Sequence, residues 1–128
     1  MRSTALIQWE KKLKIILDQM DDLFEDKYGT KFPLHPVRQK RGKTANKAHD
    51  GLFNITAKFT LGHGSELGEG YLLDLHLSTL ARVPETFKKQ LLFEALEFLQ
   101  QELPETFGGD LRADFDKNHV KIHGDLSL

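Results

Sequence analysis

Two segments in which apolar and polar residues alternate limit what this chain can fold into. Residues 52–61 (LFNITAKFTL) and 71–80 (YLLDLHLSTL) both have the period of two that is typical of a half-buried strand. The glycine-rich segment between them (GHGSELGEG, 62–70) predicts a loop, so the two strands are expected to form an antiparallel hairpin. The side chains expected to face inward are Phe53, Ile55, Ala57, Phe59, Leu61, Tyr71, Leu73, Leu75 and Leu77.

Helices and further strands are predicted on either side of this hairpin. Apolar residues at alternating steps of three and four predict a helix over 4–27, and a second apolar stripe predicts a helix over 84–102, closed by Pro104. Short alternating segments at 111–115 and 119–124 predict two more strands, with Leu111, Ala113 and Phe115 facing inward. The order α-β-β-α-β-β predicts a single α+β domain over residues 1–128, with a four-stranded, mainly antiparallel sheet and two helices packed on one face.

Composition excludes several classes of protein. The 128 residues suit one domain, and the absence of cysteine excludes disulfides and thiolate chemistry. The absence of cysteine also fits a cytoplasmic protein, which we expect here. We expect no membrane contact, because no apolar run approaches the ~20 residues that span a bilayer. We expect no cofactor either.

A basic connector joins the first helix to the first strand, at about residues 30–51. Residues 27–49 contain seven Lys and Arg but no Asp or Glu, although the whole chain has a formal net charge of −1. Loop 31–49 is therefore a candidate contact for nucleic acid or a phosphate-bearing ligand. The alternative is that it pairs with the acidic residues of the first helix. The candidate anion-binding residues are Arg38, Lys40, Arg41, Lys43 and Lys47.

Gly42-Lys43-Thr44 matches the end of a nucleotide-binding P-loop. That motif also requires a glycine five residues before Gly42, where this chain has Val37, and a helix that opens at the lysine. A strand is predicted to follow instead, so the triplet does not indicate a nucleotide site.

The polar face of the predicted sheet has histidines and carboxylates at spacings of two. Asp74 and His76 are expected to project from one strand, and His123 and Asp125 from another, beside outward-facing His119 and Lys121. Such a set is compatible with a metal site or with a proton-transfer pair, if the two strands are neighbours.

Three functions therefore remain open. The sequence favours a small binding module that contacts an anionic partner through loop 31–49, and it favours no enzymatic activity. The first alternative is a metal-assisted enzyme that uses Asp74, His76, His123 and Asp125. The second is a structural homodimer, formed through the first helix or through an unpaired sheet edge.

Overall fold

The computed structural model describes residues 4–124 and confirms the predicted order α-β-β-α-β-β. Its elements are helix α1 (Thr4–Tyr28), a 3-10 turn η1 (Lys47–His49), strands β1 (Phe53–Thr60) and β2 (Gly70–Leu77), helix α2 (Glu85–Phe107), and strands β3 (Leu111–Asp116) and β4 (His119–Gly124).

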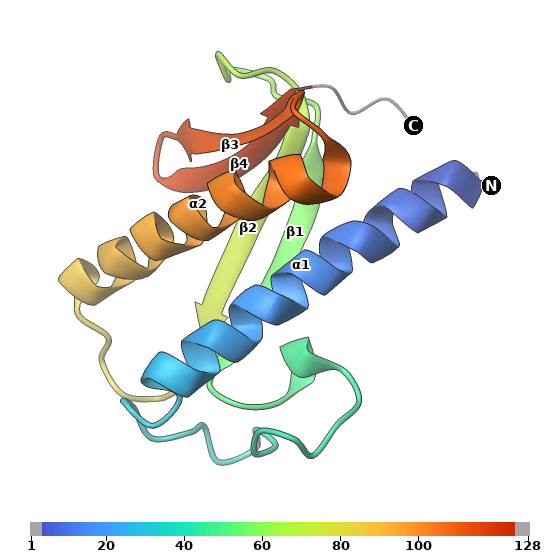
Figure 1. The fold of residues 1–128 in the computed structure, drawn as a ribbon. Helices are drawn as coiled ribbons and strands as arrows, with labels where there is room; N and C mark the ends of the chain where they lie inside the picture. Colours follow the sequence, from blue (N-terminus) through green and yellow to red (C-terminus); the bar gives the residue numbers. More distant parts are fainter. Residues whose placement is uncertain (1–3, 125–128) are drawn as a thin grey trace.

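The strands form one antiparallel sheet in the order β1-β2-β4-β3. Both helices lie across the same face of this sheet (Figure 1). The apolar stripe predicted for α1 packs into the protein's own core, where Trp9, Leu13, Ile16 and Met20 are all buried. A homodimer through that stripe would have to compete with the protein's own sheet.

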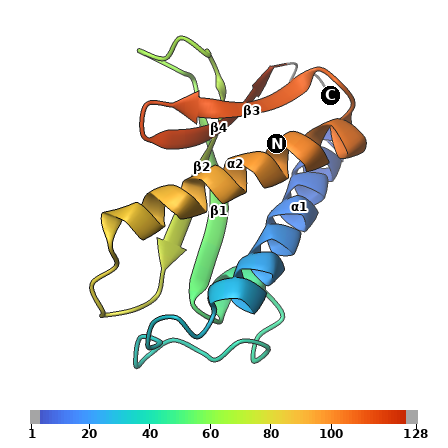
Figure 2. The same cartoon turned by 60° about the vertical axis from the view of Figure 1, so that its left-hand side comes forward.

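The two hairpins of the sheet are joined only briefly. Strands β1 and β2 pair over their full length, from Phe53–Leu77 to Thr60–Gly70. Strand β2 pairs with β4 only over Gly70–Leu72. Beyond Leu72, β2 pairs only with β1, and its far end runs past the end of β4 (Figures 1 and 2).

The predicted end of the second helix was wrong. Helix α2 continues through Pro104 to Phe107. Proline removes its own N–H and crowds the carbonyl four residues earlier, but the next turn still closes because the N–H of Gly108 donates to the carbonyl oxygen of Pro104 at 2.9 Å.

Apolar residues at the far ends of the strands were also placed wrongly. Phe59, Leu61 and Phe115 are 53%, 64% and 37% exposed, although alternation predicted that they would face the core. Alternation assigns a side chain to a face of the sheet, but it does not show how far the two helices extend over that face.

The face of the sheet opposite the helices is not uniformly solvated. Lys121 is fully buried and His123 is 5% exposed, whereas both were predicted on the wet face. Part of the cover is the loop 62–69, which folds back over β4 so that the ammonium of Lys121 donates to Ser65 Oγ at 3.0 Å and to the carbonyl oxygen of Gly68.

Candidate functional site

Arg38, the first of the predicted anion-binding residues, serves the fold of the connector. Its guanidinium donates to the carbonyl oxygens of Ala48, Asp50, Gly51 and Phe53 at 2.7–3.2 Å. These bonds hold the connector against the start of β1. These bonds occupy Nε and Nη2 of Arg38, so most of the guanidinium is committed to the chain's own carbonyl oxygens.

Arg41 lies among the protein's own carboxylates. It contacts Asp22 at 2.6 Å, Asp21 at 2.8 Å and Asp50 at 3.2 Å, and the ammonium of Lys47 also pairs with Asp22. The alternative in which the connector pairs with the acidic helix therefore accounts for these two candidates. Lys40 and Lys43 are exposed, and neither forms an ion pair with another described residue.

Asp21 is the most perturbed acid in this cluster. It is 1% exposed, and burial raises its pKa to about 7 against the opposing charge of Arg41. Its carboxyl oxygens have no well-formed hydrogen bond within residues 4–124, although Nη1 of Arg41 lies 2.8 Å from Oδ1. Asp21 is therefore a buried acid whose ion-pair partner is Arg41.

The P-loop-like triplet binds an anion that belongs to the chain itself. The N–H groups of Gly42 and Thr44 donate to Asp50 Oδ2 at 3.1 and 3.0 Å, and the Thr44 hydroxyl lies 3.2 Å from the same oxygen. Burial would raise the pKa of Asp50, but these bonds and the charge of Arg41 hold it below its usual value. An internal carboxylate thus occupies the donors that a phosphate would need.

The predicted set of metal ligands is not assembled. His123 lies opposite Gly70 in the ladder and its Nε2 is 2.8 Å from Asp114 Oδ2, while Asp74 lies beyond the end of the β2–β4 pairing and 3.6 Å from the Lys58 ammonium. No group of three potential ligands occurs among residues 4–124. Asp125 lies outside the described residues.

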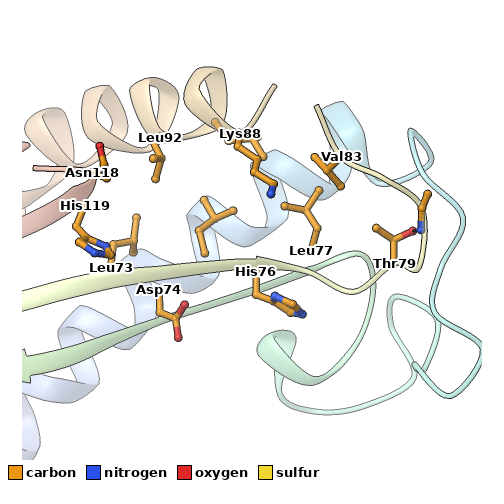
Figure 3. Close-up of a pocket in the computed structure, with 13 residues that line it drawn as sticks. Leu73, Asp74, His76, Leu77, Thr79, Val83, Lys88, Leu92, Asn118 and His119 are labelled. Atoms are coloured by element: carbon orange, nitrogen blue, oxygen red, sulfur yellow. Dashed lines mark hydrogen bonds between the residues drawn. The ribbon is translucent and has the colours of Figure 1, made fainter. Parts of the chain in front are cut away.

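A groove lies where β2 runs past the end of β4, between β2 and α2. Its volume is about 450 Å³. Its apolar lining comes from β2, from the segment that follows β2, and from α2. Asn118 and His119 stand at one end and Thr79 at the other (Figure 3). The apolar lining residues are Leu73, Leu75, Leu77, Ala81, Val83, Leu91 and Leu92.

The backbone of β2 faces this groove with unpaired polar groups. Ser78, one step beyond the Phe53–Leu77 pair, donates its N–H to Leu52 O at 2.7 Å. In an antiparallel ladder the bonding direction alternates, so the N–H and C=O of Leu75 and the N–H of Leu77 point away from β1. No strand within residues 4–124 lies there to receive them.

Side chains on β2 divide between two environments. In Figure 3 the Asp74 and His76 side chains point to one side of β2, whereas those of Leu77, Val83, Leu92 and Lys88 lie on the other side. The apolar wall and the free backbone edge thus occur together. Sequence alternation identified the leucines as inward-facing, but strand order decides that part of β2 is left without a neighbour.

Comparison with known proteins places the chain in a family. Residues 4–124 match the profile of a family described as "Uncharacterised protein". The chain belongs to this family. A protein described as "Uncharacterized protein" from Borreliella burgdorferi is 35% identical over 118 residues, which cover 91% of this chain and 92% of that relative. No solved structure gave a significant match. In this family member, no helix among residues 4–124 has the length and apolar character needed to cross a membrane.

Proposed function

We propose that this protein is a non-enzymatic interaction module that binds an extended polypeptide segment along the open edge of β2. The observation that carries the proposal is the coincidence of unpaired backbone groups at Leu75 and Leu77 with an apolar groove of about 450 Å³. Unpaired strand edges are templates for a further strand, and an adjoining helix supplies pockets for its alternate side chains.

The dimensions of the groove support a short strand. The open part of β2, Leu73–Leu77, spans about 16 Å at the rise of an extended chain. The bound segment would continue the line of β4 beside β2. Its inward side chains would contact Leu75, Leu92 and Val83, which are all only partly buried without it.

Amide hydrogen exchange tests this proposal with a control inside the same strand. The probes are fluorescein-labelled peptides of about nine residues in which valine alternates with glutamate, serine or lysine. We expect at least one of them to bind and to protect the amides of Leu75 and Leu77. The amides of Asp74 and His76, which bond to β1, should be slow to exchange in both states.

A pair of substitutions separates the groove from the rest of the surface. Ala81→Trp adds bulk to the groove lining and should abolish peptide binding. Ala5→Trp places the same bulk on an exposed position of α1 and should leave binding intact. The proposal fails if no peptide binds at millimolar concentration. If the same amides become protected only as protein concentration rises, the occupant is a second copy of the chain.

The connector supports a narrower second candidate. Exposed Lys40 and Lys43 have no ion-pair partner among the described residues, so salt-sensitive contact with nucleic acid or a phosphorylated ligand would rest on these two side chains. Lys40→Ala with Lys43→Ala should then abolish binding to a single-stranded oligonucleotide at low salt. Unchanged binding, or none in the unaltered protein, would remove this candidate.

A further inference from the structure

A second cavity adjoins the groove and has a different character. It has a volume of about 600 Å³ and lies between α2 and the β3–β4 turn. It shares Lys88, Leu92 and Asn118 with the groove, so the two form one continuous surface. A chain that leaves the β2 edge past Asn118 enters this second cavity.

An exposed aromatic pair lies in the second cavity. Phe93 is 58% exposed and Phe115 is 37% exposed, and their rings meet edge to face with centroids 5.1 Å apart. Neither residue belongs to the buried core cluster. Exposed apolar side chains that gather beside a groove mark interaction surfaces more often than isolated ones do.

The charge around this pair is positive. Lys88, Lys89 and Lys117 line the second cavity, and Glu85 is the only acid among its lining residues. Glu85 already pairs with Lys88 at 3.2 Å. Lys89 and Lys117 form no ion pair with any described residue. A ligand with negative charge would therefore complement this part of the surface.

We propose that the segment bound by this protein is acidic and continues from the β2 edge over Asn118 onto the Phe93–Phe115 pair. This inference rests on the proposed function and specifies the partner: an extended protein segment with apolar side chains at alternate positions and carboxylates between or beside them. Its backbone bonds to β2, its apolar side chains occupy the groove, and its carboxylates lie near Lys89 and Lys117.

The same three peptides test the inference. We expect the glutamate peptide to bind about tenfold more tightly than the lysine peptide at low salt, because several exposed charge pairs each contribute a small factor. Raising the salt concentration should reduce this preference. Phe93→Ser should weaken binding of the glutamate peptide without reducing the helix content of the protein.

Charge-reversal variants test whether the preference for an acidic peptide comes from the lysines of the second cavity. Lys89→Glu with Lys117→Glu should weaken binding of the glutamate peptide about tenfold and strengthen binding of the lysine peptide. The matched control, Lys11→Glu with Lys12→Glu, makes the same change of net charge on exposed positions of α1 and should leave both affinities unchanged.

The outcomes distinguish the inference from the function beneath it. If the glutamate and lysine peptides bind equally and both protect Leu75, the groove binds strands but the inference about acidic partners is wrong. If the control pair has the same effect as the Lys89 and Lys117 pair, only net charge matters and the inference is again wrong. If no peptide protects Leu75, the proposed function itself fails.

Discussion

Replacing Arg41 with methionine should destabilise the protein strongly and in a pH-dependent way. Methionine keeps much of the aliphatic length but removes the cation that faces Asp21, Asp22 and Asp50. Asp21 and Asp50 are both 1% exposed, so the variant leaves two buried carboxylates without that cation. Breaking a buried ion pair in this way typically costs about 3–5 kcal/mol.

The pH dependence follows from Asp21. Its pKa is about 7 in the folded protein and 3.8 when exposed, so the folded state holds the extra proton between these values. Stability contributed by this group therefore falls as pH rises through that window, by about 4 kcal/mol if the full difference of three units applies. Because Asp21 can take up a proton when Arg41 is lost, Arg41→Met should cost less near pH 5 than near pH 8.

Urea unfolding at the two pH values measures both effects. Near pH 8 the midpoint for Arg41→Met should fall by on the order of 1–2 M. Asp21→Asn should be more stable than the unaltered protein near pH 8, and it should reduce the cost of Arg41→Met in a double-mutant cycle. Lys43→Met, in the same connector, should change stability by less than about 0.5 kcal/mol. The reasoning is refuted if Arg41→Met costs under about 1 kcal/mol at both pH values.

Three further substitutions have expected outcomes. Gly70→Ala should destabilise the protein by about 2 kcal/mol or more in urea unfolding, because an added Cβ would lie 2.2 Å from the carbonyl oxygen of Ile122; an unchanged midpoint would mean that the β2–β4 junction yields easily. Lys121→Met should speed amide exchange in the loop 62–69, since the bond to Ser65 is lost; unaltered exchange would show that other contacts hold the loop. Arg38→Met should cost about 2–3 kcal/mol by thermal unfolding because four carbonyl oxygens lose a charged donor, and a smaller loss would indicate that water replaces it.

Local patterns predicted the elements and the fold class. The spacing of Trp9, Leu13, Ile16 and Met20 located α1, and alternation located β1 and β2, because helical and strand periods are set by the backbone alone. The order of the strands depends on which edges meet in three dimensions. The groove could not be predicted because it depends on where the pairing between β2 and β4 stops, after Leu72 and Lys121.

The candidate sites show the same division between local and tertiary information. Composition identified a basic connector, but contacts across the chain decide that Arg41 pairs with α1 while Lys43 stays exposed. The polar face was predicted from alternation, yet the loop 62–69 covers Lys121. The sequence held a signal for Phe93, which lies outside the apolar stripe of α2, but alternation placed Phe115 in the core.

The three residue pairs that join β2 to β4 have a mechanical consequence. The β1–β2 and β3–β4 hairpins pair with each other only over this short junction, which lies beside the loop that Lys121 anchors. A polypeptide strand bound to β2 beyond this junction would extend the sheet there and restrict the motion of the two hairpins relative to each other. Binding in the groove would then reduce motion at the other end of β2, where the glycine-rich loop is held.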